Sequence, residues 1–406
     1  MDIVQPLLEL LDKVFGPLNA WLEPLRANPK LYTLAWSALT LAFMFISGYC
    51  LAWLARLIAR LAGKNRLYQQ KTFTGYLYAS PWIVGFVLFV LGPTLLSLYW
   101  GFTNLRLGEP TQWVGLDNYV NLVKDRNFIT SLFNSLYMTI IGVPLQLASG
   151  LAMAMLLNER LRGRNVFRTI YYVPVLLATS TAVLFTWRMM LNANNGIINS
   201  ILRALNVGPI RYLIGAFIFL TELSSAAIMA LQTGNFKIVE KIVSMGFPGP
   251  ERMPLWLGAD GLAFLWNKPS VVLIMVWSAG AMMVIYLAAL SGVPQSLYDA
   301  AKVDGASAWQ RFRHITWPMI APATFYNLII GMIATLQIFE ASVSLVRDGG
   351  QNQSLYFVAY YLWRSTFRFN KGGYGAAMSW ALLLIILVLT VIQFRTSGRR
   401  VYYHGG

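Results

Sequence analysis

The chain has few of the side chains that usually perform chemistry. Among 406 residues there is one cysteine, Cys50, and there are two histidines, His314 and His404. A single cysteine excludes an intrachain disulfide and a metal cluster built from cysteines. Neither histidine has a neighbouring partner of the kind that catalysis or metal binding needs. We therefore expect no catalytic residue and no metal ligand, and a protein that is not an enzyme.

Charge is also scarce. Charged residues make up 12% of the chain and hydrophobic residues 57%, and the mean hydropathy is +0.55. An ordinary soluble domain has about 25% charged and about 45–50% apolar residues. Runs of ~20 apolar residues are long enough to cross a bilayer core of about 30 Å, and lipid requires such runs to be helices. The composition predicts an all-α polytopic membrane protein with spans near residues 34–55, 76–100, 131–157, 169–190, 270–292, 318–340 and 375–394.

The net charge of +16 is distributed unevenly among the linkers. Linker 56–75 has five basic residues and no acidic one, linker 158–168 has four arginines against Glu159, and the tail from residue 395 has three arginines. Short basic linkers mark the cytoplasmic side of a membrane protein. We therefore expect the N-terminus outside, and the C-terminus and residues 294–318 in the cytoplasm. The positive charge indicates topology and attraction to membrane lipid rather than a nucleic acid partner.

Two segments do not fit the pattern of simple spans. Residues 1–33 contain four acidic residues and four prolines, without the basic start and apolar core of a signal peptide. We expect helical segments over Val4–Leu25 on the noncytoplasmic membrane surface, followed by an extra N-terminal span. Residues 207–254 contain an apolar run with Glu222 in its middle, and a carboxylate at the bilayer centre is costly.

Topology argues further against a crossing in residues 207–254. One extra crossing would move residues 294–318 to the outside, and the return crossing would have to use residues 232–254, which contain five charged residues. We expect a noncytoplasmic insertion instead: a re-entrant or interfacial helix followed by an amphipathic helix over Phe236–Met245.

Residues 294–318 form a polar, helix-biased segment between two apolar runs. The pattern predicts a short helix over Leu297–Val303, a break at Gly305, and a second helix over Ala306–Thr316. Glycine suits the break because it accepts left-handed backbone angles, and Asp304 can cap the second helix with its carboxylate. A short helical knob on the face of a membrane protein has a shape suited to docking into a partner.

The residues of this segment resemble a known motif. Asp299-Ala300-Ala301 is followed after three residues by Gly305, and then by Ile315-Thr316-Trp317-Pro318. This order resembles the EAA loop of ABC-importer permeases, whose coupling helices seat in a groove of the ATPase subunit. Aspartate stands where the family usually has glutamate, so the carboxylate reaches one methylene less far. Arg311, Phe312 and Pro322 also fit the carbohydrate-importer version of the motif.

Shorter stretches support the carbohydrate-importer resemblance over roughly residues 70–395, apart from the insertion. Val114-Gly115-Leu116-Asp117-Asn118-Tyr119 is similar to a segment that follows the corresponding span in that branch. Gly349-Gly350 is similar to the family's Gly-Gly-Pro, with Gln351 in place of proline. Each stretch is weak alone, and their order and spacing together are specific.

The resemblance implies a six-span ABC-importer type I permease core plus one extra N-terminal span, in a prokaryotic inner membrane. It also implies as partners a second permease subunit, two ATP-binding subunits and an extracytoplasmic solute-binding protein. The chain has no phosphate-binding loop, because Gly63-Lys64 is followed by Asn65, so ATP and Mg would be bound by the partner ATPase subunits and no cofactor by this chain. The implied segments are 1–33 (interfacial), 34–71 (extra span and basic linker), 72–206 (first half of the core), 207–254 (insertion), 255–395 (second half of the core) and 396–406 (tail).

The resemblance also implies functional residues. Coupling to the ATPase would fall to the loop residues Asp299, Ala300, Ala301, Asp304, Gly305, Ala306 and Phe312. Gln337 and Glu340 are three apart and would share a helix face. Each pathway residue also has a purely structural interpretation, such as packing or a bond to its own helix. The implied substrate-pathway residues are Thr179, Trp277, Ser278, Gln337, Phe339 and Glu340.

Other functions stay open at this point. An ABC permease for another solute, such as a glycerol phosphate, an amino acid or a peptide, is the nearest alternative. A phosphate-bearing solute would need basic groups in the cavity, and Arg188 is the one basic residue within the expected spans. A secondary transporter would usually show inverted repeats and broken helices, which the sequence does not indicate.

Overall fold

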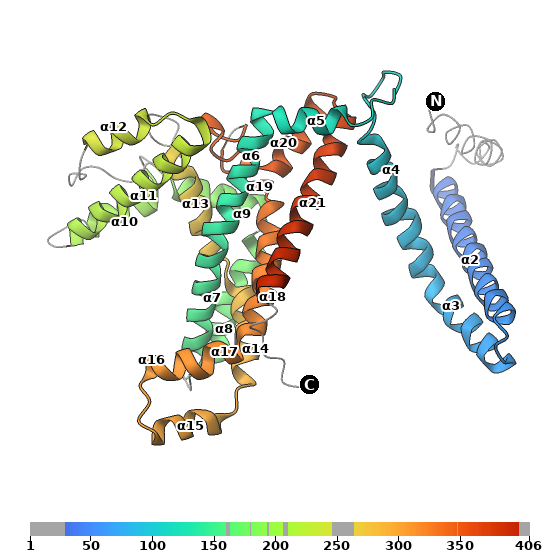
Figure 1. The fold of residues 1–406 in the computed structure, drawn as a ribbon, viewed down its shortest axis with the longest axis horizontal. Helices are drawn as coiled ribbons and strands as arrows, with labels where there is room; N and C mark the ends of the chain where they lie inside the picture. Colours follow the sequence, from blue (N-terminus) through green and yellow to red (C-terminus); the bar gives the residue numbers. More distant parts are fainter. Residues whose placement is uncertain are drawn as a thin grey trace. The chain divides into compact units, whose positions relative to one another are not determined.

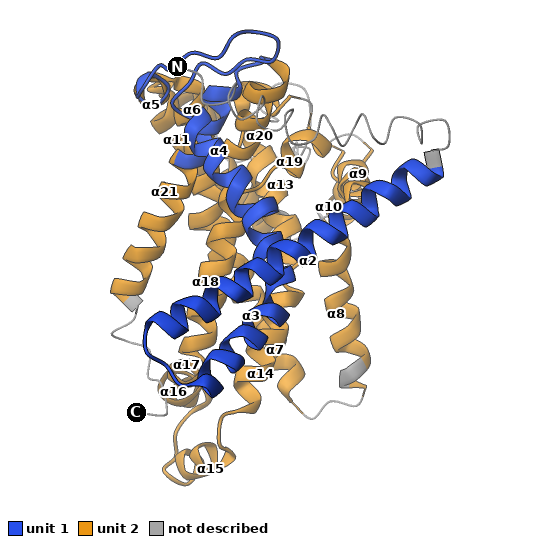
Figure 2. Ribbon diagram, turned by 90° about the vertical axis from the view of Figure 1, so that its right-hand side faces the viewer, with its two compact units in different colours: residues 1–119, 369–380 blue, residues 120–368, 381–406 orange. Residues whose placement is uncertain are grey.

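A computed structural model describes residues 29–159, 163–178, 180–192, 195–205, 210–245, 264–346 and 348–397. This part of the chain is helical apart from turns and one isolated bridge between Thr103 and Trp113. The contacts divide the chain into two compact units, unit 1 with residues 1–119 and 369–380 and unit 2 with residues 120–368 and 381–406 (Figure 2). The predicted all-α class is confirmed. The expected helices within Val4–Leu25 lie outside the described residues.

Unit 1 is dominated by a helical hairpin of α2 (Pro29–Leu61) and α3 (Arg66–Phe86). Small residues let the two helices approach closely, since a Cβ added to Gly48 would lie 2.2 Å from Ser80 Oγ, and Ala52 is fully buried. Asn65 begins α3 by accepting a 2.8 Å bond from the Tyr68 amide. Helix α3 continues through a π-turn, η2 (Val87–Leu91), into α4 (Gly92–Trp100).

Unit 2 contains the helix bundle, whose core lies between α7 (Val143–Asn158), α14 (Gly280–Ser291) and α18 (Ala321–Leu336). Gly150 makes the contact between α7 and α14 tight, because a Cβ there would lie 3.1 Å from Met282 Cβ. The other helical elements of unit 2, two of which continue into unit 1, are α5 (Asp117–Lys124), α6 (Arg126–Tyr137), η3 (Met138–Gly142), α8 (Arg164–Ala178), α9 (Thr181–Met190), α10 (Ile197–Leu205), α11 (Ile210–Thr233), α12 (Lys237–Met245), α13 (Phe264–Trp277), α15 (Gln295–Val303), α16 (Ala308–Arg311), η4 (Phe312–Thr316), α17 (Trp317–Met319), α19 (Glu340–Ser344), η5 (Gln351–Gln353), α20 (Val358–Trp363), η6 (Arg364–Arg368) and α21 (Gly372–Ser397).

Most of the expected spans coincide with these helices. Among the described residues, five helical runs are long and apolar enough to cross a membrane, and three bent pairs of helices pass the same test together. The expected span 318–340 contains α18 and begins at a bend, because the helical run Ala308–Met319 meets α18 at Ile320 with an angle of 66°. Pro322 causes the break, since its nitrogen cannot donate to the carbonyl of Pro318 and its ring crowds that oxygen.

The insertion contains two helices, α11 and α12, which Figure 1 shows extending sideways from the bundle of unit 2. Phe217 and Glu222 of α11 both contact Trp266, while Gln232 contacts Lys268. The stretch from residue 217 to 232 is about 22 Å long, whereas residues 266 and 268 are about 3 Å apart along α13. Helix α11 therefore crosses the start of α13 steeply instead of running beside it.

The expected noncytoplasmic insertion contains one helix of span length, α11, and one short helix, α12. Helix α11 is among the five runs long enough to span, so the noncytoplasmic position of residues 207–254 stays a prediction. The amphipathic helix expected over Phe236–Met245 is present as α12, and residues 246–254 lie outside the described residues.

Candidate functional site

The candidate site is the knob, defined as α15, the turn at residues 304–307, α16 and η4. Figures 1 and 2 place α15 and α16 at one end of unit 2 and the start of α6 at the other end. The predicted first helix and the break after Val303 are confirmed, with α15 beginning two residues earlier than expected, at Gln295. The knob connects the end of α14 to α17, which leads into α18.

Gly305 ends α15 in the way the sequence indicates. Its φ is +74°, and its amide donates to the Lys302 carbonyl at 3.1 Å while the Ala306 amide donates to the Ala301 carbonyl at 2.9 Å. This pair of bonds is a Schellman motif, which satisfies carbonyls at a helix end and needs a left-handed residue. A Cβ at Gly305 would meet no atom within 4 Å, so glycine is required by the backbone angle and not by space.

The second helix differs from the expectation in its start and its cap. It begins at Ala308, not at Ala306, and the cap is Ser307 rather than Asp304. The Ser307 hydroxyl accepts from the Gln310 amide at 3.3 Å, and the Gln310 side chain accepts from the Ser307 amide at 2.7 Å. This capping box satisfies two donors at once, whereas Asp304 is the C-cap of α15, between Val303 and the left-handed Gly305.

Three contacts hold the two halves of the knob together and to the bundle. The Tyr298 and Thr316 hydroxyls lie 2.9 Å apart, and Arg311 donates to the Ala306 carbonyl at 2.6 Å. Phe312 packs against the hydrophobic core cluster that includes Leu157 of α7 and Leu290 of α14. The knob is therefore packed against the ends of α7 and α14.

The outer surface of the knob is exposed and partly apolar. Val303 is 88% exposed and Trp309 65%. Asp299 accepts from Lys302 at 3.4 Å and from Gln295 at 3.2 Å, and both contacts lie within its own exposed helix. Exposed pairs of this kind contribute about 0–1 kcal/mol, so a cation on a partner could displace Lys302 at little cost.

A cavity of about 580 Å³ lies between the knob and the end of α7. Asn158 and Glu159 line it from α7, and Lys302 and Arg311 line it from the knob. The knob therefore has an open space of mixed polarity on its inner side as well as an exposed outer face.

Two of the predicted substrate-pathway residues lie at a break between α13 and α14. These helices bend by 42° at residues 278–279. The Ser278 hydroxyl donates to the Met275 carbonyl at 3.1 Å, and the Trp277 ring meets the Trp187 ring edge to face at 5.3 Å. Non-helical backbone at membrane depth is tolerated where protein or a water-filled cavity surrounds it.

Three more predicted pathway residues lie at a second break, and here one expectation is wrong. Gln337 and Glu340 do not share a helix face, because α18 ends at Leu336 and α19 begins at Glu340. The amides of Gln337 and Ile338 donate to the backbone carbonyls three residues earlier, at 3.3 and 3.4 Å. The backbone at residues 337–338 therefore has the tighter hydrogen-bond pattern of a 3₁₀ turn. Gln337 and Glu340 are exposed, and Phe339 is half-buried.

Phe339 is part of a group of aromatic rings beyond the second break. Its ring lies 6.2 Å from that of Tyr360 and 5.8 Å from that of Trp363. Tyr360 donates to Asp348, which also pairs with Arg368 at 2.6 Å. These contacts, the Tyr360 hydrogen bond first, lower the pKa of the Asp348 carboxyl, and they tie the loop at Asp348 to α20 and η6.

The two breaks border one hydrophobic core but are not joined directly. Trp277 and Ile338 both pack against the core cluster that contains Trp187. Within the described residues, no hydrogen bond or ring contact links Trp277 or Ser278 to Gln337, Phe339 or Glu340. Thr179 lies outside the described residues.

Sequence reasoning missed a buried polar cluster at the start of α13. Lys268 donates to Gln232 at 3.4 Å, and Gln232 donates to Asn134 at 3.1 Å. The Trp266 indole donates to Glu222 at 3.2 Å, and Glu222 is 1% exposed. The expected span began after Lys268, so the lysine was placed outside it, and its partners are distant in sequence.

The amino-acid sequence matches a known protein family and several known proteins. A family model described as the inner membrane component of binding-protein-dependent transport systems matches residues 142–399. The chain is 30% identical over 342 residues to "Probable ABC transporter permease protein YesP" of Bacillus subtilis, covering 84% of this chain and 95% of that protein. It is 28% identical to the arabinooligosaccharides transport system permease protein AraP of the same organism, covering 84% and 93%.

A further relative and a solved structure agree with these matches. The trehalose/maltose transport system permease protein MalF of Thermococcus litoralis is 28% identical, covering 82% of this chain and 97% of that protein. In the crystal structure of a bacterial ABC transporter involved in the import of the acidic polysaccharide alginate, one chain matches with a TM-score of 0.59 and 21% identity. The match covers 82% of this chain and 99% of that chain, and at this identity it shows the fold.

Proposed function

The chain belongs to the family of inner membrane components of binding-protein-dependent transport systems, and on that premise we propose that it is the permease subunit of an ATP-driven importer for a sugar or an oligosaccharide. The observation that carries the proposal is the knob. It presents exposed Asp299, Val303 and Trp309 to the surroundings while Phe312 anchors it in the bundle. An exposed apolar surface of this kind is typical of a docking site.

Energy for transport comes from partner subunits in this proposal. The sequence contains no phosphate-binding loop, so ATP and Mg are bound by two ATP-binding subunits that dock on the knob and on the equivalent knob of a second permease. A solute-binding protein delivers the substrate on the opposite face. The N-terminus lies outside and the C-terminus in the cytoplasm, as the basic linkers favour.

A saccharide is the substrate class that the relatives and the breaks support best. AraP and MalF are named for arabinooligosaccharides and for trehalose and maltose. Sugars need aromatic or apolar faces for their C–H surfaces and a few hydrogen-bonding groups. Trp277 and Phe339 supply rings at the two breaks, and Ser278 and Gln337 supply polar groups beside them.

The proposed mechanism is alternating access driven through the knob. Closure of the ATPase dimer moves the knob, and the Phe312 contact and the Tyr298–Thr316 bond pass this movement to α7, α14 and α18. The helices tilt and open the pathway toward the solute-binding protein, and hydrolysis returns them. Glycine at position 305 keeps the bend of the knob, and the alanines around it allow close approach to the ATPase.

The test is a gentle detergent purification of the tagged chain from its native membrane, followed by mass spectrometry of the proteins that accompany it. The proposal expects an ATP-binding subunit, a second permease and a solute-binding protein, with a saccharide bound to the last. Recovery of the chain alone under conditions that preserve a control ABC complex would contradict it. A co-purified binding protein that prefers an amino acid or a glycerol phosphate would overturn the substrate class alone.

A further inference from the structure

The turn of the α2–α3 hairpin carries a basic pocket. Arg56 and Arg60 lie on successive turns near the end of α2, and Arg66 begins α3. They line a pocket of about 540 Å³ within unit 1. The chain has no aspartate or glutamate between Glu23 and Glu109, so no acidic residue of the hairpin can neutralise the pocket. Its remaining lining residues are Trp53, Leu57, Gln69 and Gln70.

The arginines of this pocket are left available for a ligand. Over the described part of the chain, none of the three forms an ion pair, and the guanidinium of Arg56 lies 6.0 Å from the centre of the Phe73 ring. Guanidinium groups match the oxygens of a phosphate in pairs, and Gln70 adds an amide beside them. Three guanidinium groups with no anion form a site that is complementary to a phosphate.

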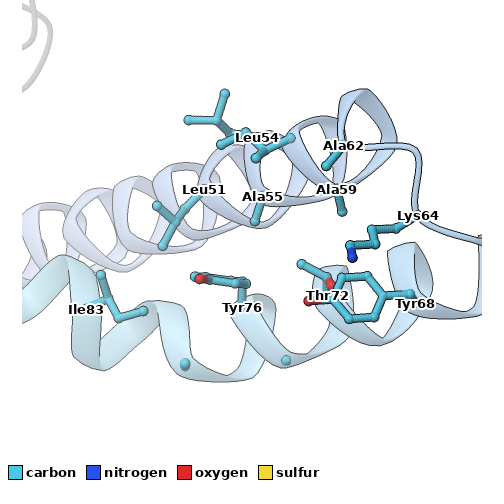
Figure 3. A pocket seen from close by; sticks show the side chains of 13 residues that line it. Leu51, Leu54, Ala55, Ala59, Ala62, Lys64, Tyr68, Thr72, Tyr76 and Ile83 are labelled. Atoms are coloured by element: carbon cyan, nitrogen blue, oxygen red, sulfur yellow. The ribbon is translucent and has the colours of Figure 1, made fainter.

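The other flank of the same hairpin has a different character. An apolar groove of about 550 Å³ runs along it, lined by residues such as Leu51, Leu54 and Ile83 (Figure 3). The Lys64 ammonium lies 5.8 Å from the centre of the Tyr68 ring inside this groove. Four of the six groove residues on α2, at positions 55, 58, 59 and 62, are offset by two positions from the pocket residues 53, 56, 57 and 60, which is about 200° around the helix. Lys64 therefore belongs to the groove flank and not to the arginine pocket.

We propose that the arginine pocket binds an anionic phospholipid, with the phosphate among Arg56, Arg60 and Arg66 and the glycerol and upper acyl chains against Trp53 and Leu57. Basic pockets between helices at the cytoplasmic face of a membrane are suited to such head groups. Trp53 is 54% exposed, and Leu57, half-buried on the next turn of α2, lines the pocket with it. This apolar surface favours a lipid over a soluble phosphate, because only a lipid has chains to cover it. The proposal is independent of the transported substrate.

The test compares two variants that remove the same charge from the same end of the hairpin. R56Q/R60Q removes two cations from the pocket, and K64Q/K71Q removes two cations outside it. The importer complex is placed in nanodiscs that contain phosphatidylglycerol and phosphatidylcholine, and native mass spectrometry measures which lipid stays bound. The wild type is expected to retain phosphatidylglycerol preferentially. R56Q/R60Q lowers that retention at least about fivefold, and K64Q/K71Q changes it less than about twofold.

Other results overturn the proposal. Equal losses in both double variants would mean attraction to the general positive charge, and displacement by excess inorganic phosphate would mean a soluble ligand. A photocrosslinker at Gln70 that captures the second permease instead of lipid would mean that a protein fills the pocket. If R56Q/R60Q does not assemble, R66Q replaces it, because Arg66 lies in the exposed first turn of α3, and retention equal to that of the wild type would again contradict the site.

Discussion

The hydroxyl groups of Tyr298 and Thr316 lie 2.9 Å apart and join the first helix of the knob to the π-helical turn that leads toward α18. Thr316 is buried, while the helix that carries Tyr298 is largely exposed. One hydrogen bond therefore connects the exposed helix of the knob with the base of a bundle helix. This connection ties the two halves of the knob together, and in the proposed mechanism it makes the knob a stiff lever.

Replacing Tyr298 by phenylalanine tests the stiffness of this lever. The variant keeps the ring and loses the hydroxyl, which removes about 1 kcal/mol from the stability of the knob. We expect the complex to assemble, with a several-fold fall in the transport achieved per ATP hydrolysed in proteoliposomes. Thr390→Val, which removes a hydroxyl that donates to the Ile386 carbonyl of its own helix, α21, is the matched control and should leave the ratio unchanged. Equal ratios in wild type and Y298F would mean that this bond carries no force.

Two substitutions at Gly305 test its backbone angle in steps, because a Cβ there meets no neighbour and any loss comes from the backbone. Gly305→Ala costs about 1–2 kcal/mol for the left-handed angle, and it meets no neighbour. Gly305→Pro fixes φ near −65°, which is incompatible with the observed +74°, and removes the amide bond to Lys302. We expect partial loss of substrate-stimulated ATPase activity with alanine and complete loss with proline, at equal membrane insertion. Normal coupling in G305P would remove the knob from the mechanism.

The cap of α16 can be assigned by two alanine substitutions. Ser307→Ala loses the capping box and should destabilise the knob by about 1 kcal/mol, which would be seen as faster proteolysis between α15 and α16. Asp304→Ala, three residues earlier, should leave the proteolysis rate close to that of the wild type. The reverse order of sensitivity would restore Asp304 as the cap.

Substitutions at the α13–α14 and α18–α19 breaks should impair transport without preventing the ATP-binding subunits from docking. Trp277→Ala and Phe339→Ala remove ring faces worth about 1–2 kcal/mol each to a bound sugar. We expect uptake at low substrate concentration to fall about five- to thirtyfold while the ATP-binding subunits still co-purify. Phe394→Ala, a ring that packs on Phe325, is the control for loss of aromatic packing elsewhere in unit 2. A loss of co-purification in W277A would indicate a structural role instead.

The helices and the bend of the knob were predictable because their signals are local. Apolar runs of span length and a glycine after Val303 depend on neighbouring residues alone. Ser307 with Gln310 is also a local signal, since the two stand three apart in the pattern of a capping box, and it competed with the nearby Asp304. Choosing between them required knowing where α15 ends.

The break at residues 337–339 and the burial of Lys268 were not predictable in the same way. No glycine or proline marks the end of α18, and the chain turns there while Ile338 packs into a core built from distant segments. Lys268 is buried, and it donates to Gln232, a residue of the insertion that stands 36 positions earlier in the sequence. Such partners follow from tertiary packing and not from spacing along one helix.

The measurement that tests the account most directly is site-specific photocrosslinking from the knob. A photoreactive residue replaces Val303, which is 88% exposed at the end of α15, and a control residue replaces Val243, which is 57% exposed on α12. The account predicts an adduct between position 303 and an ATP-binding subunit in native membranes, which changes in yield when ATP is added, and no such adduct from position 243. An ATP-binding subunit captured from position 243 but not from 303 would contradict it.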